Sequence, residues 1–151
     1  MRFAPDPERR LPSRPEHPRW RMILFVSAAV VTICTMRPWT MVEFERLWGQ
    51  LSGPPGWQSS AGFTCLSTSM LVAVMALAET STPSSRQAVR PASLLLSLIA
   101  LASMIGSLAT GPGMLRGVSA TWTLFYYAAC AGLAALVVAC AHRQLRHRHS
   151  A

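Results

Sequence analysis

Four long apolar runs alternate with polar stretches along the chain, and none of them carries an ionisable residue in its interior. The runs lie at 22–36, 61–78, 92–110 and 118–141. A helix needs about 20 apolar residues to cross a bilayer core of about 30 Å. The last three runs meet that length, and the first reaches it over 20–39 if Trp20 and Trp39 mark the two interfaces. The pattern therefore predicts an all-α membrane protein, a bundle of four transmembrane helices.

The polar stretch after the first run has a helical pattern of its own. Thr40 and Glu43 have the spacing of a capping box at a helix start. Apolar residues then recur at helical spacing, at Met41, Phe44, Trp48 and Leu51. The sequence Gly53-Pro54-Pro55-Gly56 would end such a helix. We therefore expect a short amphipathic helix over Thr40–Leu51, lying in the membrane interface of the first outer loop.

Composition agrees with a membrane protein. Of the 151 residues, 51% are hydrophobic and only 13% are charged, whereas an average soluble domain has about 25% charged residues. A soluble domain of this size could not bury four such runs in one core. All fourteen basic side chains are Arg, and Lys and Asn are absent. This codon bias indicates a GC-rich, bacterial genome.

The arginines are distributed unevenly about the four runs. Eleven of them lie in 1–21, in 79–91 and in 142–151, which share one side if the chain crosses four times. The other side has only Arg37, Arg46 and Arg116. Because cytoplasmic loops carry the excess of Arg, we expect a bacterial cytoplasmic (inner) membrane protein with both termini in the cytoplasm. The net charge of +8 is then a topology signal with some attraction to anionic lipid, and nucleic-acid binding is disfavoured.

The chain divides into three parts. Residues 1–19 hold five prolines among alternating charges and predict a disordered basic cytoplasmic arm. Residues 20–142 form the four-helix transmembrane domain. Residues 143–151 form a basic cytoplasmic tail. His147 and His149 in the tail, with His142 just before it, could attract a metal, although the interleaved arginines oppose a divalent cation.

Small side chains mark the faces where membrane helices approach one another. The stripe on the second helix is Gly62, Cys65, Ser69, Ala73, Ala76 and Thr80. The third helix has Ser93, Ser97, Ala100, Met104, Ser107 and Gly111, with Leu95, Leu98 and Ile105 opposite. The fourth has Thr121, Ala128, Ala131, Ala135 and Ala139. The first helix has only a mixed stripe, Leu24, Ala28, Val31 and Thr35, so we expect it at the periphery or against another subunit.

The residues offer little catalytic chemistry. Transporters and membrane enzymes place ionisable side chains at mid-membrane, but every Glu and His lies outside the apolar runs. We therefore predict no catalytic residue, no cofactor and no metal. The four cysteines lie in apolar runs without a CxxC motif. Cys34 and Cys65 would lie at similar depth, so a disulfide between them stays open.

One polar group remains as a candidate site. Glu43, Glu45, Arg46 and Trp48 would gather at the outer interface, where they could contact a lipid headgroup or a periplasmic partner. The simpler interpretation is a solvated helix face. The leading hypothesis is a non-catalytic accessory or scaffold subunit of a membrane complex, whose partners are the lipid bilayer and other membrane proteins or a second copy. The alternative is a membrane-embedded enzyme or transport component acting on lipid at the outer interface. A weaker third is a sensor that signals through its basic ends.

Overall fold

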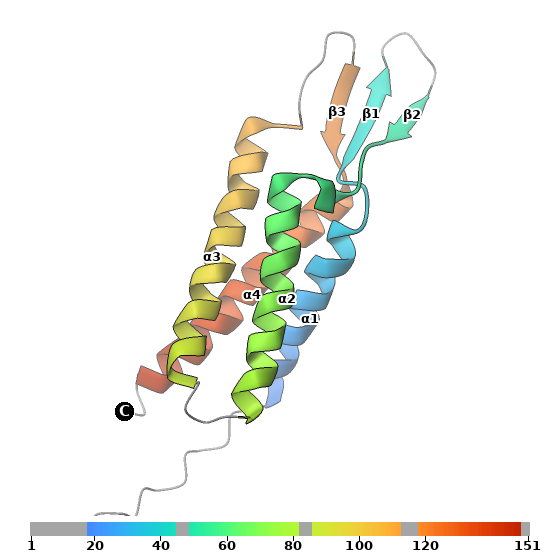
Figure 1. Ribbon diagram of the computed structural model, residues 1–151. Coiled ribbons are helices and arrows are strands. Elements are labelled where there is room, and N and C mark those ends of the chain that lie inside the picture. Colours follow the sequence, from blue (N-terminus) through green and yellow to red (C-terminus); the bar gives the residue numbers. More distant parts are fainter. Residues whose placement is uncertain (1–17, 45–48, 82–85, 113–117, 149–151) are drawn as a thin grey trace, which may run out of the picture.

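The computed structural model describes residues 18–44, 49–81, 86–112 and 118–148 (Figure 1). Most of them belong to four helices, namely α1 (Pro18–Thr35), α2 (Ser60–Ser81), α3 (Arg86–Thr110) and α4 (Leu124–Arg148). The shorter elements are the strands β1 (Thr40–Phe44), β2 (Gln50–Ser52) and β3 (Val118–Trp122) and a 3-10 turn η1 (Gly56–Gln58). Of the predicted arm at 1–19, the structure describes only 18–19. Of the predicted tail at 143–151, it describes 143–148.

The four helices lie side by side, each in contact with the next along the chain, and α4 also contacts α1 (Figure 1). Within the described residues, three helices are long and apolar enough to cross a membrane, over Ser60–Glu79, Ala88–Thr110 and Leu124–Leu145. α1 has 18 residues, and Arg19 and Arg21 fall in its first turn. The protein is therefore mostly helical with three candidate spans, which fits the multi-pass membrane protein that the sequence predicts.

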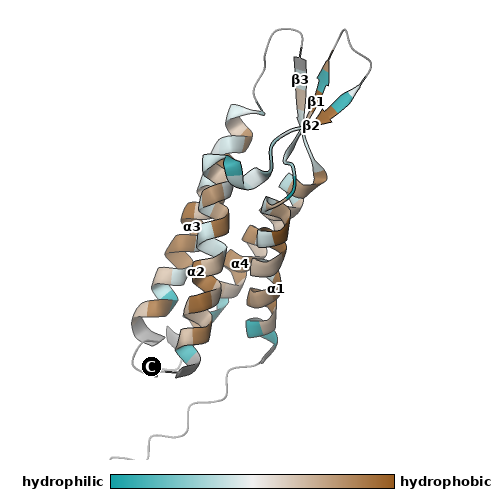
Figure 2. Ribbon diagram, turned by 45° about the vertical axis from the view of Figure 1, so that its right-hand side comes forward, coloured by the Kyte–Doolittle hydropathy of each residue, from teal (hydrophilic) through white to brown (hydrophobic). Residues whose placement is uncertain are grey.

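The middle of the molecule and its two ends differ in hydropathy. Hydrophobic residues run along the helices, and the most hydrophilic described residues gather towards the two ends (Figure 2). We call the end that carries the strands the sheet end. The opposite end, where α1 begins and α4 ends, is the terminal end (Figure 1).

The predicted packing faces of the second and third helices are confirmed. On α2, the stripe residues Gly62, Cys65, Ser69 and Ala76 are buried. On α3, Ser93, Ser97, Ala100 and Met104 are buried, and the bulky residues opposite, Leu95, Leu98 and Ile105, are exposed. The side chain of Thr80 lies outside the described part. Small residues thus face neighbouring helices and large ones face outward, as close packing in lipid requires.

The packing faces of the first and fourth helices need correction. Of the predicted stripe on α4, Ala139 is buried, but Ala131 is exposed and Ala128 and Ala135 are only half-buried. The buried face also runs through Tyr126, Ala129, Leu133 and Leu136. Larger side chains fill this face because α4 packs against both α1 and α3. The mixed stripe of α1 is fully buried, so α1 is not peripheral, and it packs against α2 and α4. The stripe needs no small residues because Leu24 and Val31 fill the core between the helices.

A three-stranded antiparallel sheet of order β2-β1-β3 projects beyond the helices (Figure 1). The predicted helix over Thr40–Leu51 was therefore wrong for the residues described. Val42 pairs with Leu51 of β2 and with Ala120 of β3. Burial along β1 alternates with the period of two that a strand requires, so Thr40, Val42 and Phe44 are half-buried and Met41 and Glu43 are exposed.

β3 also changes the start of the fourth helix. The prediction of one continuous helix over 118–141 was wrong at its beginning, since 118–122 form β3 and α4 begins at Leu124. Val118, Thr121 and Trp122 are residue types that favour strands, and β1 supplies the hydrogen-bonding partner. α4 continues past 141 to Arg148, which includes much of the predicted tail.

Candidate functional site

The predicted interface group is only partly described. Glu43 lies on β1 with an exposed side chain, and Gln50 Nε2 donates a hydrogen bond to its Oε1. Glu45, Arg46 and Trp48 lie outside the described residues. Glu43 therefore belongs to an exposed strand position paired with β2, and not to a helix lying flat in the interface.

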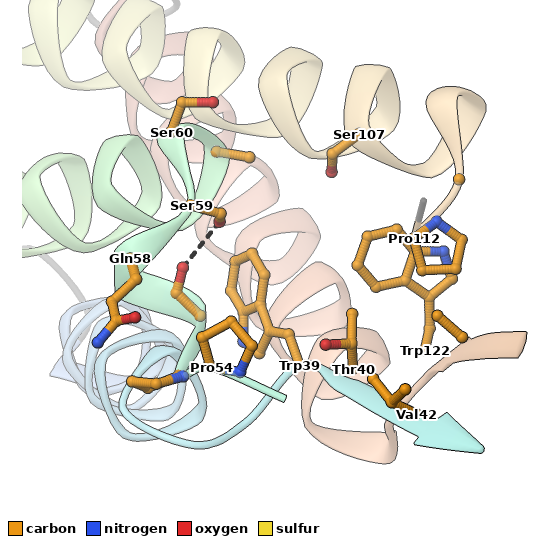
Figure 3. Close-up of a pocket in the computed structure, with 15 residues that line it drawn as sticks. Trp39, Thr40, Val42, Pro54, Gln58, Ser59, Ser60, Ser107, Pro112 and Trp122 are labelled. Carbon is orange, nitrogen blue, oxygen red and sulfur yellow. Dashed lines mark hydrogen bonds between the residues drawn. The ribbon is translucent and has the colours of Figure 1, made fainter. Parts of the chain in front are cut away.

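A cavity of about 530 Å³ lies at the sheet end, between the sheet and the ends of two helices (Figure 3). One wall is the segment between residues 54 and 61, which leads through η1 into α2. The opposite wall is the end of α3 with Ser107, Gly111 and Pro112. The base of the sheet closes a third side with Trp39, Thr40, Val42, Ala120 and Trp122.

Trp39 is the most firmly held of the lining residues. Its side chain is 3% exposed, and its Nε1 donates a hydrogen bond of 3.0 Å to the carbonyl oxygen of Cys34. The backbone of Gly56 lies against the indole, so that a Cβ at position 56 would stand 2.2 Å from the ring. Glycine is needed at position 56 because its backbone approaches the ring too closely for a side chain.

Aromatic stacking joins the sheet to α4. The ring of Tyr126 lies edge-on to Trp39 at 5.3 Å between centroids and stacks on Trp122 at 4.1 Å. Its hydroxyl donates to the carbonyl oxygen of Met104 at 2.8 Å and lies 2.9 Å from Ser107 Oγ. Tyr126 thereby connects the base of the sheet, α4 and α3, and it fixes one side of the cavity.

Three hydrogen bonds to backbone carbonyl oxygens complete the junction between sheet and helices. Thr123 Oγ1 donates to the carbonyl oxygen of Pro38 at 2.7 Å, and Thr123 N donates to that of Trp39 at 2.8 Å. Gly56 N donates to the carbonyl oxygen of Arg37 at 3.0 Å. The segments that leave α1, enter α2 and enter α4 are therefore hydrogen-bonded to one another.

Among the residues that the structure describes, those that line the cavity include no ionisable side chain. Two of its hydroxyls already hold internal bonds, since Ser59 Oγ donates to Gly56 O at 2.7 Å and Ser107 Oγ donates to Met104 O at 2.8 Å. Gln58 and Ser60 are exposed at its edge, so their amide and hydroxyl groups can reach a ligand. The cavity therefore offers indole surface and neutral hydrogen-bonding groups.

A second polar cluster lies near the terminal end, where the sequence predicted only a polar connection. Glu79 of α2 is 4% exposed and Arg143 of α4 is 6% exposed. Arg143 Nη2 donates to Glu79 Oε2, and Arg90 Nε of α3 lies 3.4 Å from Glu79 Oε1. We call these three residues the ion cluster; it ties α2, α3 and α4 together.

Arg90 reaches the ion cluster because α3 begins at Arg86. The third apolar run begins only at residue 92, whereas α3 begins earlier and has Pro91 inside it, with one further helical turn before Pro91. A signal for the cluster was present in the sequence, since Glu79, Arg90 and Arg143 all fall at ends of apolar runs on the same predicted side. Whether these three side chains meet depends on how each helix is rotated about its axis, and the apolar runs do not show that rotation.

Histidine and cysteine add no further site among the described residues. The ring of His142 stacks on Trp20 of α1 at 3.9 Å between centroids. No group of three His, Cys, Asp or Glu side chains that could hold a metal ion occurs in the described ranges. All four cysteines are free thiols, so Cys34 and Cys65 form no disulfide.

The cavity could not be found from the sequence, because it is built by segments that are far apart in the chain and meet only through the sheet. Comparison of the chain with protein-family models, with curated proteins and with solved structures gave no match.

Proposed function

We propose that the chain is a four-span membrane protein that acts as a non-catalytic accessory or scaffold subunit and presents its sheet to a partner protein. The observation that carries the proposal is the firm junction between sheet and helices, made by Trp39, Thr123 and Tyr126. A sheet held in this way has one orientation relative to the membrane, which a docking element needs. The buried hydroxyls named above are occupied by internal hydrogen bonds, which is typical of packing.

We propose α1 as the fourth span. It lies beside α2 and α4, its stripe from Leu24 to Thr35 is buried against them, and Val26 and Ile33 are exposed on its outer side. Arg19 and Arg21 at its start can extend their guanidinium groups towards water. With four spans, the distribution of arginines supports a terminal end in the cytoplasm of a bacterial inner membrane and a sheet on the outer side.

Reporter fusions test this topology. Fusions at residue 151 and between 79 and 91 should both report a cytoplasmic location, and a fusion between 49 and 53 should report the outer side. An outer location for the fusion at residue 151 would contradict the topology. α1 itself is tested by a tag at residue 1, which should report the cytoplasm, opposite to the fusion between 49 and 53; the same side for both would remove α1 as a span.

Photocrosslinking tests the scaffold role. A photoreactive residue in place of Leu51, which is 61% exposed on β2, or of Thr121 on β3 should give one discrete protein adduct in native membranes. The matched control is Leu98, which is 45% exposed on α3 and should face lipid. The proposal fails if the sheet positions give no protein adduct, or if Leu98 gives the same adduct as they do.

A second candidate function is a component that acts on lipid at the outer interface. The uncharged cavity at the sheet end favours it, because the cavity lies where helices and sheet meet and could admit part of a lipid. The ligand that such a cavity would select can be inferred independently of any scaffold role.

A further inference from the structure

The cavity lies level with the ends of the candidate spans. Ser60, the first residue of the span in α2, lines it, and Gly111 follows the last residue of the span in α3. Trp122 lies two residues before Leu124, where the span in α4 begins. Three span ends at one depth mark the boundary between hydrocarbon and headgroups. A molecule in this cavity would therefore have its polar part in the headgroup region and its apolar part towards the hydrocarbon.

Within the part of the chain that the structure describes, the lining carries no ionisable group, and this restricts the ligand. A phosphate or ammonium group placed in the cavity would lose part of its hydration without gaining an opposite charge, which is costly. An uncharged hydroxyl or carbonyl group loses less, and the amide of Gln58 or the hydroxyl of Ser60 can replace its water. The cavity therefore selects against the charged headgroups that dominate a membrane surface.

The remaining lining suits the apolar part of such a molecule. The half-buried Trp122 supplies indole surface, to which Trp39 adds only the small part that its 3% exposure leaves open, and Val42 and Pro112 extend it (Figure 3). Among the residue types in this lining, aromatic side chains offer the largest apolar area for contact with a ligand. The volume of about 530 Å³ lies within the range of roughly 300–1,000 Å³ that is typical of small-molecule sites.

From these observations we propose that the cavity binds an uncharged amphiphile taken from the membrane leaflet at the sheet end, a lipid whose head bears hydroxyl or ester carbonyl groups and no phosphate. The head lies at the edge of the cavity beside Gln58 and Ser60, and the first part of its apolar chain lies against Trp39 and Trp122. This site does not depend on the proposed scaffold role, and either can fail without the other.

Two photoreactive lipids with identical acyl chains provide the test. One is a diacylglycerol and the other a phosphatidic acid, so that they differ only in the phosphate. The full-length protein is placed in phosphatidylethanolamine and phosphatidylglycerol vesicles with each probe in turn, and labelled peptides are mapped by mass spectrometry. We expect diacylglycerol to label the segments 54–61 and 107–112 at least five-fold more than phosphatidic acid. Equal labelling by the two probes would overturn the proposal.

Two serines of α2 provide a matched pair of variants. Ser60 and Ser67 are both exposed, and only Ser60 lines the cavity. Ser60→Trp should fill the cavity and lower labelling by diacylglycerol at least five-fold, whereas Ser67→Trp should change it less than two-fold. Equal effects of the two substitutions would mean that the probe contacts α2 from bulk lipid and not in the cavity, which would also overturn the proposal.

Ser60→Trp could also lower labelling by disturbing the fold, so a second variant that should gain binding completes the test. Gln58 is exposed, so Gln58→Arg should preserve the fold while placing a cation beside the head. Labelling by phosphatidic acid should then rise at least five-fold, towards the level of diacylglycerol in the unmodified protein. No rise would show that the lipid head does not lie at Gln58. Displacement of the diacylglycerol label by excess water-soluble glycerol would show that the site takes its ligand from water, contrary to the proposal.

Discussion

Glu79→Gln should be among the most destabilising single substitutions in the described part of the chain. Glutamine has nearly the size of glutamate and can still hydrogen-bond, so the substitution removes the charge and little else. It leaves Arg143, which is 6% exposed, and Arg90 without the carboxylate that both contact. The effect therefore measures the role of the charge in the ion cluster and not the filling of space.

The expected magnitude follows from the geometry and the burial of the charges. Two unit charges at the 3.4 Å that separates Arg90 Nε from Glu79 Oε1 attract by about 5 kcal/mol at an effective dielectric constant of about 20. Part of that attraction is offset by the desolvation of the charges on folding. Removing one partner of a buried ion pair nevertheless costs about 3–5 kcal/mol, because the other charge stays buried. We expect the free energy of unfolding to fall by that amount in Glu79→Gln.

Reversible unfolding in mixed micelles, followed as the fraction of denaturing detergent rises, provides the measurement. The control is Glu43→Gln, which alters an exposed carboxylate on β1 and should change the free energy of unfolding by less than about 0.5 kcal/mol. Adding Arg143→Met to Glu79→Gln should restore part of the loss, since the charge of Arg143, which Glu79 no longer offsets, is then gone. A loss in Glu79→Gln no larger than that in Glu43→Gln would refute the role of the ion cluster in holding the helices.

Two further predictions concern packing, and the same unfolding measurement checks both. Gly62→Ala should destabilise the protein, because its Cβ would stand 2.0 Å from the carbonyl oxygen of Gly56; Gly106→Ala, where no atom lies within 4 Å, should not. Ala129→Leu should cost about 1–3 kcal/mol because Ala129 is fully buried on α4, whereas Ala131→Leu should be nearly neutral because Ala131 is exposed. The reverse order within either pair would show that the helix faces are misassigned.

The sequence predicted the features that depend on neighbouring residues in one segment. The long apolar runs marked α2, α3 and most of α4, since length and apolarity alone decide whether a helix can cross a bilayer. The stripes of small residues on α2 and α3 gave the correct buried faces, because close packing within lipid needs small side chains. On α4 the same argument held only for Ala139, since Ala131 lies outward and larger residues such as Leu133 fill the core.

The sheet could not be predicted from local pattern. Met41, Phe44 and Leu51 have helical spacing, yet Thr40, Val42 and Phe44 also alternate as a strand does, and a short segment can satisfy both. Pairing with β3 favours the strand over the helix, and Ala120 of β3 pairs with Val42 although 78 positions separate them in the chain. The cavity depends on that pairing, and it was missed for the same reason.

The two ends of the molecule hold the helices by different chemistry, and this difference explains the character of the cavity. At the terminal end, the ion cluster joins α2, α3 and α4 through charges. At the sheet end, Tyr126 connects α3, α4 and the base of the sheet through stacking and neutral hydrogen bonds. Because the described walls of the cavity are held without charge, the described lining can stay free of ionisable groups. The property that we expect to select an uncharged lipid head is therefore a consequence of how the sheet is joined to the helices.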